Sequence, residues 1–323
     1  MKIETNIELI PSKKQKAWGW PAAVNFILGG MAAGFYILCF LDELLQKNMF
    51  AVSMPSICKV LAPVLLGLGF LALTAEAGRP LRVYYLLRNS RTSWMSIEFL
   101  TGMVFILSAI FSVVINHPVF PIAAASSALI FTVSQGMILC KARAMPAWNI
   151  SLMPILFLTS GLSMGSGLVI LLSALHLLSS SDTFLSVSLI CVTMDMAAWL
   201  LYLHWSGDKS FLSATRVFRH PIVIAFNTGI GHAFPVLLLL IGVISGMRSR
   251  DSIVLLAGLS ILIGGAVRKV IIVMGAGNMR EITLGRSKDF SAGGDQPARK
   301  QSYLKHPYNR CNRIPADFIS KKW

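Results

Sequence analysis

The chain has 323 residues, of which 55% are hydrophobic and only 13% are charged. This balance lies well outside that of a water-soluble domain and excludes an ordinary soluble globular fold. The formal net charge of +15 does not point to nucleic acid, because the basic residues gather in the short loops between apolar segments and in a polar tail.

Eight apolar segments are long enough to cross a membrane, because a hydrocarbon core of roughly 30 Å needs about 20 helical residues. They span residues 18–41, 57–75, 97–115, 119–140, 152–178, 184–205, 222–245 and 253–276. The sequence therefore predicts an all-α polytopic membrane protein. Its eight-helix membrane domain covers residues 1–276, and a basic polar tail covers residues 277–323.

Basic residues are distributed unevenly between the two sides of these spans. With an even number of spans, both termini lie on one side, and that side carries 13 Lys and Arg outside the tail, against 4 on the other. The 13 are Lys2, Lys13, Lys14, Lys16, Arg79, Arg82, Arg88, Arg91, Lys141, Arg143, Lys209, Arg216 and Arg219. The positive-inside rule then predicts that both termini are cytoplasmic, in the inner membrane of a bacterium or archaeon.

The tail has two readings that the sequence leaves open. It carries ten Lys and Arg between Arg280 and Lys322 and cannot build a core. It is either a disordered segment drawn to anionic lipid or an arm that orders against a soluble partner. In the second case Tyr303, Tyr308, Phe318 and Trp323 would be its anchors.

The first and fifth spans share a pattern of small residues. Gly30 and Gly34 in the first match Gly161 and Gly165 in the fifth, and each pair follows a phenylalanine. Small residues at this spacing let helix backbones approach closely. The match favours a parallel repeat of two four-helix bundles.

Few polar residues lie at membrane depth, and each is a candidate site because charge there is costly. They are Glu76, Glu98, Asp195, His232, Arg268 and Lys269. Asp195 near the middle of the sixth span is either an acid paired with Arg268 or Lys269 for packing, or part of a proton relay. His232, alone on an apolar helix, is expected to be a hydrogen-bonded core residue.

Histidine and cysteine positions do not predict a metal centre. A bis-histidine haem needs two imidazoles at matching depth on facing helices, and the six histidines do not meet that spacing. The five cysteines include no C-x-x-C pair, so neither a zinc site nor an iron–sulfur cluster is expected. A b-type cytochrome anchor stays as an alternative.

Several motifs together resemble the NrfD-like family, the integral-membrane subunits of polysulfide reductase and its relatives among molybdopterin and iron–sulfur oxidoreductases. They are "WGWPAAVNFILGGMAAG" (18–34), "EAGRP" (76–80), "SRTSWMS" (90–96) and "MPAWN" (145–149) followed by "LFLTSGLSMG". The resemblance covers most of the first five spans.

The resemblance implies an eight-helix quinone-binding subunit without haem or iron–sulfur cluster. Its partners would be a ferredoxin-like four-cluster iron–sulfur subunit and a molybdopterin or tungstopterin catalytic subunit. The quinone, menaquinone or ubiquinone, would bind at Ala22, Asn25, Glu76 and Ser134. Of these only Glu76 keeps the family's residue type, since the family example has asparagine, histidine and tyrosine at the other three.

Chemistry supports the same location independently. Quinone turnover moves two electrons and two protons, so a site needs hydrogen-bonding groups, an acid or base and an apolar slot. Asn25, Glu76, Ser134 and Gln135 all lie within about two helical turns of the surface that carries the termini. Trp18 and Arg79 complete the predicted quinone set, and Glu76 and Asp195 are the candidate proton-transfer groups. The plainer reading of Glu76 is a helix-end acid paired with Arg79.

Two further expectations follow. Electrons must enter near the quinone, so the catalytic module should dock on the basic side, which is predicted to be cytoplasmic and thus inverted relative to polysulfide reductase. A secondary transporter built from parallel repeats with a midplane acid is the remaining alternative.

Overall fold

The architecture is that of a helical membrane protein. The structure is a computed structural model, and it describes residues 7–10, 13–15, 18–46, 54–76, 93–115, 117–179, 183–246, 252–279 and 282–284. Within these residues, eight helical stretches are long and apolar enough to cross a membrane. The expected all-α polytopic fold is confirmed, and the eight spans lie within a few residues of their predicted bounds.

Six spans are single α-helices and two are composite. The single ones are α1 (Trp20–Gln46), α2 (Ser56–Glu76), α4 (Trp94–Val114), α5 (Val119–Cys140), α6 (Met153–Ala174) and α7 (Phe184–Leu203). The seventh span joins α9 (Pro221–Ile224), the π-helix η4 (Ala225–Ala233) and α10 (Phe234–Ile244). The eighth joins α11 (Ser252–Val270) and the π-helix η5 (Ile271–Gly275). The short helices α8 (Lys209–Ala214) and η3 (Arg216–Arg219) precede α9.

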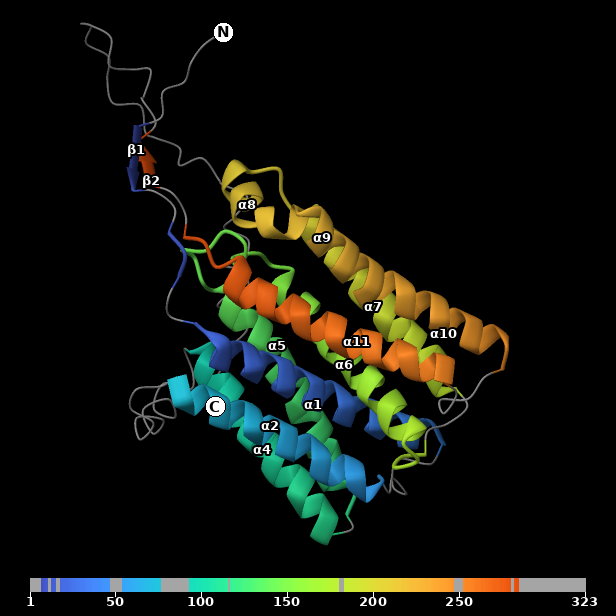
Figure 1. Cartoon of the computed structure of the whole chain (residues 1–323). Helices are drawn as coiled ribbons and strands as arrows, with labels where there is room; N and C mark the ends of the chain where they lie inside the picture. The colour runs from blue at the N-terminus through green and yellow to red at the C-terminus, as the bar shows by residue number, and fades with distance from the viewer. Residues whose placement is uncertain are drawn as a thin grey trace, which may run out of the picture.

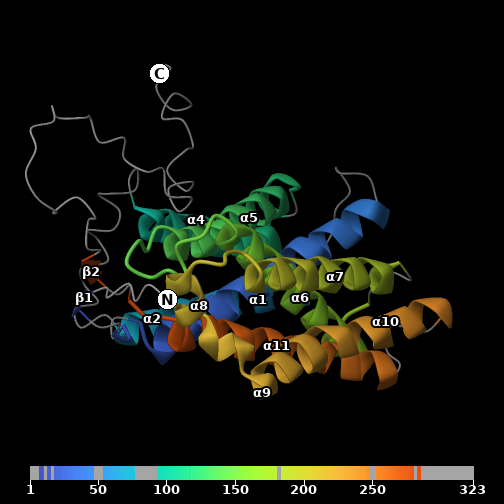
Figure 2. The same ribbon diagram turned by 90° about the horizontal axis from the view of Figure 1, so that it is seen from above.

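The spans divide into two four-helix groups. Helices α1, α2, α4 and α5 pack on one another, and α6, α7, the seventh span and α11 form the second group. Figure 1 shows the first group in blue and green beside the second in yellow-green and orange. In Figure 2, α4 and α5 lie on the side away from α10 and α11. The two groups meet mainly where α1 packs against α6, a contact that the sequence did not predict.

The contact between α1 and α6 is a backbone-to-backbone crossing made by glycines. A Cβ on Gly34 would overlap the carbonyl of Gly161, and a Cβ on Gly165 would overlap the backbone of Gly34. At Gly161 a Cβ would lie 2.9 Å from the carbonyl oxygen of Gly30. All four glycines of the predicted pattern therefore meet at one crossing, which only residues without a side chain allow.

Burial follows from this arrangement. In the most apolar stretch of α6, 78% of the residues are buried, against 28% in α2 and in α4. Leucine, isoleucine and valine side chains of the outer helices face outward, as in lipid-facing helices. The backbone groups of these helices are hydrogen-bonded within the helix, so lipid can surround them. Helix α6 is thus the centre of the molecule, and polar groups near it are shielded from lipid.

The two ends of the described chain meet at one end of the bundle. Strand β1 (Ile7–Ile10) pairs antiparallel with β2 (Ile282–Leu284), as Figure 1 shows. The Gln15 backbone N–H also donates to the Gly277 carbonyl at 2.7 Å. We call this end, where α1 begins and η5 ends, the terminal end. The strand pair was not expected from the sequence, and residues 285–323 of the predicted tail lie outside the described residues.

Replacing Gly34 by leucine should prevent the two helix groups from closing. Overpacking typically costs about 1–3 kcal/mol, and here the obstacle is backbone, so the loss should reach at least the upper end. Thermal unfolding of the detergent-solubilised protein measures it. The control is Gly67→Leu, because a Cβ on Gly67 meets nothing within 4 Å. Equal stability of the two variants would contradict the crossing.

Candidate functional site

One face of α4 carries an acid into the protein interior. Its buried residues are Ser96, Glu98, Gly102, Phe105, Ala109 and Ser112. From Glu98 onward these recur every three or four residues, the spacing of one helical face. Glu98 is the fifth residue of α4, so it lies about 6 Å along the axis from the start of the helix. It is 4% exposed.

Two amides from neighbouring helices hold the Glu98 carboxylate. Asn25 Nδ2 on α1 donates to Glu98 Oε1 at 3.1 Å, and Gln135 Nε2 on α5 donates to the same oxygen at 3.3 Å. Gln135 Nε2 also lies 3.4 Å from the Asn25 carbonyl oxygen. We call these three residues the carboxylate–amide cluster. It joins three of the four helices in the first group.

Each of these two amides has a side-chain oxygen that accepts no hydrogen bond from the part of the chain that the structure describes. Among the described residues, Asn25 Oδ1 and Gln135 Oε1 are buried and have no hydrogen-bond partner. Buried acceptors are normally satisfied, and each of these two oxygens could accept a hydrogen bond from a bound group. Each amide can also turn to exchange its oxygen and its N–H₂. The cluster can therefore serve either a donor or an acceptor.

Small residues make the room for this cluster. A Cβ on Gly29 would lie 3.0 Å from Gln135 Nε2, and one on Gly69 of α2 would lie 3.1 Å from Asn25 Oδ1. Phe131 packs against Gly29, and Phe70 packs edge-to-face on Phe131 at 6.0 Å. Two aromatic rings therefore lie beside the polar groups.

Lys269 of α11 reaches the same region from the second helix group. Its Nζ donates to the Phe26 carbonyl at 2.7 Å and lies 5.6 Å from the centroid of the Phe157 ring. A Cβ on Gly30 would overlap the Lys269 ammonium and would lie 3.4 Å from Gln135 Oε1. Gly30 therefore allows a buried ammonium beside the carboxylate–amide cluster.

A second polar group surrounds Asp195, deeper in the second helix group. Arg268 Nη2 donates to Asp195 Oδ2 at 2.5 Å and to Ser160 Oγ at 3.1 Å. Thr159 Oγ1 donates to Asp195 Oδ1 at 3.3 Å. We call Thr159, Ser160, Asp195, His232 and Arg268 the Asp195 cluster. Asp195, His232 and Arg268 are each 1% exposed, so the charges are paired inside the protein.

The π-helix η4 supplies His232 to this cluster. His232 Nδ1 donates to the Asn227 carbonyl at 2.7 Å, which leaves Nε2 to accept from the Arg268 guanidinium. His232 Nε2 also lies 3.4 Å from Asp195 Oδ2. π-helical turns are frequent at functional sites because they re-aim side chains. The hydrogen-bonded core histidine expected from the sequence is what the structure contains.

The predicted quinone residues fall at different places. Asn25 and Gln135 come together, whereas Ser134 Oγ donates to the Ile130 carbonyl of its own helix at 2.7 Å. Trp18 stacks on Phe26 with ring centroids 5.5 Å apart. Ala22 is buried.

Glu76 and Arg79 belong to the "EAGRP" motif. Glu76 is the last residue of α2, but its side chain lies outside the described residues, as does all of Arg79. Gly69, which touches Asn25, precedes Glu76 by seven positions, or about 10 Å of helix. Glu76 is therefore at the rim of the terminal end, while the carboxylate–amide cluster lies deeper.

Sequence reasoning noticed Glu98 but did not place it in the site. An acid near the start of an apolar span is easily taken for a helix-end residue at the interface. The signal that identifies it is the face it shares with Gly102, Phe105 and Ala109, all of which are buried. That spacing in the third span predicts that Glu98 faces the protein interior.

Two residues of the "MPAWN" motif, Trp148 and Asn149, make structural hydrogen bonds at the terminal end. In the loop between α5 and α6, Trp148 Nε1 donates to the Ile272 carbonyl of η5 at 2.8 Å. Asn149 Nδ2 donates to the Cys140 carbonyl at the end of α5, at 2.5 Å. Trp18 packs against Trp148 with centroids 5.8 Å apart. The "MPAWN" loop therefore ties α1, α5 and the last span together beneath the terminal surface.

Metal ligands do not converge in the part of the chain that the structure describes. It contains no group of three or more His, Cys, Asp or Glu residues that could hold a metal ion. Of the five histidines described, only His232 is buried.

A comparison with known protein families identifies the family of this chain. The model of the family described as "Polysulphide reductase, NrfD" matches residues 9–279. The chain belongs to the NrfD family. The matched region includes all eight spans and both polar clusters. Membership of this family makes the NrfD protein a membrane subunit of an oxidoreductase complex. No protein of curated function matches the chain significantly.

Removing Arg268 should strongly destabilise this NrfD protein. Deleting one partner of a buried ion pair typically costs about 3–5 kcal/mol, because the other charge is left unpaired. Arg268→Met should therefore lower the thermal unfolding temperature in detergent, and adding Asp195→Asn should restore most of it. A double-mutant cycle measures the coupling. Additive losses would show that the two residues do not form a stabilising pair.

Proposed function

We propose that this NrfD protein is the quinone-reactive membrane anchor of an oxidoreductase complex. It would pass electrons between a menaquinone or ubiquinone pool and an iron–sulfur plus molybdopterin or tungstopterin module. The observation that carries the proposal is the carboxylate–amide cluster with its two unpartnered acceptors, Asn25 Oδ1 and Gln135 Oε1. Family membership supplies the class of complex.

The donor set fits a quinone head group. A quinone presents two carbonyl acceptors and its reduced form presents two hydroxyl donors, so a site for both needs groups of reversible polarity. Side-chain amides meet that need, because each carries a donor and an acceptor. When bound, the quinone supplies two-electron, two-proton redox chemistry.

Each residue then has a distinct role. Asn25 and Gln135 orient the head group by hydrogen bonds. Glu98 exchanges a proton, as a carboxyl group positioned next to the reacting group can. Glu76 lies about 10 Å nearer the terminal end than Gly69, measured along α2. It is proposed as the outer carboxylate that passes the proton to water. Trp18 and Arg79 are proposed to line the entrance.

Asp195 is proposed as a second, deeper proton-transfer group. Its contacts with Arg268 and His232 also suit a purely structural ion pair. The Asp195→Asn, Arg268→Met variant separates the two roles. A relay predicts altered pH dependence of turnover in that variant, whereas packing predicts an unchanged profile.

The soluble partners are proposed to dock on the terminal end. Exposed basic residues gather there, namely Lys13, Lys14, Arg143, Lys209 and Arg216. Such a surface would attract an acidic face of a four-cluster ferredoxin-like subunit, to which the molybdopterin or tungstopterin subunit would bind. The same charge pattern supports a cytoplasmic location of this end and of both termini.

One observation favours a transporter as a second candidate. A π-helical segment and a buried Asp–Arg–His cluster lie within the membrane-spanning region, as ion pathways require. Substrate flux in liposomes containing this subunit alone would support transport. Quinone-dependent turnover only in the presence of the partner subunits would support the anchor function.

Glu98→Gln should lower quinone-linked turnover by on the order of 10²-fold, the usual contribution of a positioned acid or base. Assembly with the partner subunits should persist, because glutamine keeps the shape and the hydrogen bonds. Glu76→Gln should also slow turnover. The matched control is Thr101→Val, one turn along α4, since Thr101 donates only within its own helix. Wild-type turnover in Glu98→Gln would refute the assignment.

A cysteine in the tail, Ser302→Cys in a Cys311→Ser background, should resist membrane-impermeant thiol reagents in intact cells. Position 302 lies outside the described residues, so the expectation rests on the loop charges alone. Gln46→Cys, an exposed position at the other end of α1, should be labelled readily. The reverse pattern would invert the orientation.

A further inference from the structure

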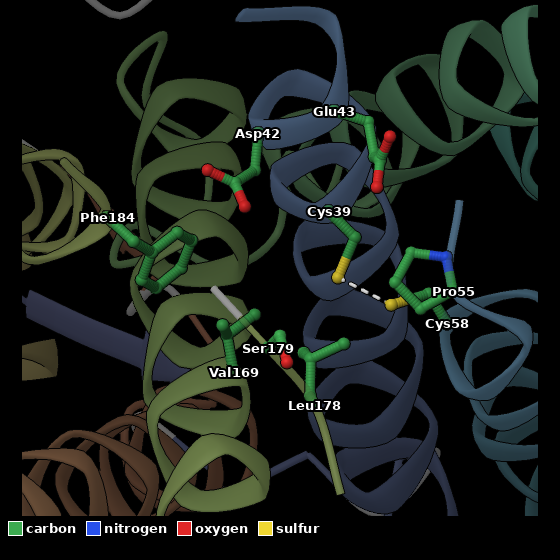
Figure 3. Close-up of a pocket in the computed structure, with 9 residues that line it drawn as sticks. All are labelled: Cys39, Asp42, Glu43, Pro55, Cys58, Val169, Leu178, Ser179 and Phe184. Atoms are coloured by element: carbon green, nitrogen blue, oxygen red, sulfur yellow. Dashed lines mark hydrogen bonds between the residues drawn. The ribbon is translucent and has the colours of Figure 1, made fainter. Parts of the chain in front are cut away.

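Two cysteines face each other at the end of the bundle opposite the terminal end. Cys39 of α1 and Cys58 of α2 have their sulfur atoms 2.9 Å apart, and both are unbridged thiols. Figure 3 shows the two side chains pointing at one another across the α1–α2 contact. A disulfide bond is about 2.05 Å long. Only a short approach of the two sulfurs separates this pair from a covalent bond.

The pair lines a small pocket close to water. Cys58 is the third residue of α2, and Cys39 lies seven residues before the end of α1 at Gln46. Asp42 and Glu43 line the same pocket and are partly exposed. The cavity measures about 10 Å³, close to the least space that holds one water molecule.

We propose that Cys39 and Cys58 are an oxidation site, a dithiol that hydrogen peroxide converts to a disulfide linking α1 to α2. Hydrogen peroxide is a small, neutral two-electron oxidant of thiols. Cys39 is 6% exposed and Cys58 is fully buried, so Cys39 is the first to react.

The reaction balances without any further reagent. Cys39 Sγ, after loss of its proton, attacks one oxygen of hydrogen peroxide, and the O–O bond breaks. The leaving hydroxide takes up the proton and departs as water, and Cys39 becomes a sulfenic acid. Cys58 Sγ then attacks the Cys39 sulfur, the S–O bond breaks, and a second water leaves with the Cys58 proton. Two thiols are oxidised and one peroxide is reduced to two waters.

The link would act on the helices that build the carboxylate–amide cluster. Helix α1 carries Asn25, and α2 packs on Asn25 through Gly69. A disulfide between Cys39 and Cys58 would close residues 39–58 into a loop and restrict how α1 and α2 separate. Oxidation at one end of the bundle is therefore expected to stiffen the α1–α2 pair as a whole.

The test counts free thiols in a variant that keeps only this pair, Cys140→Ser, Cys191→Ser, Cys311→Ser. After reduction, the purified protein is treated with hydrogen peroxide, denatured, and labelled with maleimide-linked polyethylene glycol. Two adducts should fall to none, return to two after dithiothreitol, and the thermal unfolding temperature should rise on oxidation. Two adducts before and after peroxide would overturn the proposal, as would an intermolecular dimer.

Trapping the intermediate gives an independent measure of the order of reaction. With Cys58→Ser, peroxide should leave a sulfenic acid on Cys39 that dimedone labels when the protein is denatured in its presence, whereas Cys58 in the Cys39→Ser protein should stay unlabelled. Dimedone on Cys58 instead would overturn the assignment of Cys39 as the attacking thiol. If the multiple variant does not fold, mass spectrometry of the peroxide-treated wild-type protein should find a peptide containing Cys39 joined to one containing Cys58, and its absence would refute the link.

Discussion

The glycine crossing of α1 and α6 is the constraint on which the rest of the structure depends. Gly34 and Gly165 bring two backbones into direct contact, and Gly161 lies against Gly30 in the same way. In a membrane, helix association relies on close packing because lipid is as apolar as the side chains. This contact joins the two four-helix groups and brings Lys269 of α11 within reach of α1.

That closeness brings a residue of the second helix group beside the carboxylate–amide cluster of the first. Gly30 leaves room for the Lys269 ammonium, and Lys269 follows Arg268 directly in α11. Lys269 is therefore beside the carboxylate–amide cluster while Arg268 is bound to Asp195. The two clusters lie in different helix groups, but Lys269, which lies beside one, and Arg268, which belongs to the other, are adjacent in the sequence.

The proposed function places hydrogen-bonding groups of reversible polarity and a carboxyl group together, near the surface that a redox partner would approach. Glu98 has two amide donors on one oxygen, and those amides retain unused acceptors. A buried acceptor without a partner costs free energy. A ligand that donates a hydrogen bond to Asn25 Oδ1 or Gln135 Oε1 would remove that cost.

The sequence by itself determined the membrane class, the eight spans, the glycine pattern and the family. These follow from composition, segment length and motifs, which are local properties of the chain. It also predicted that Asn25 and Gln135 belong near the terminal end, and it offered Arg268 as a partner for Asp195. Only the tertiary structure decided that Glu98 faces Asn25 and Gln135, that His232 joins the ion pair, and that Cys39 meets Cys58. The reason is rotational: hydropathy fixes where a helix crosses the membrane, but packing against its neighbours fixes which side chains turn toward one another.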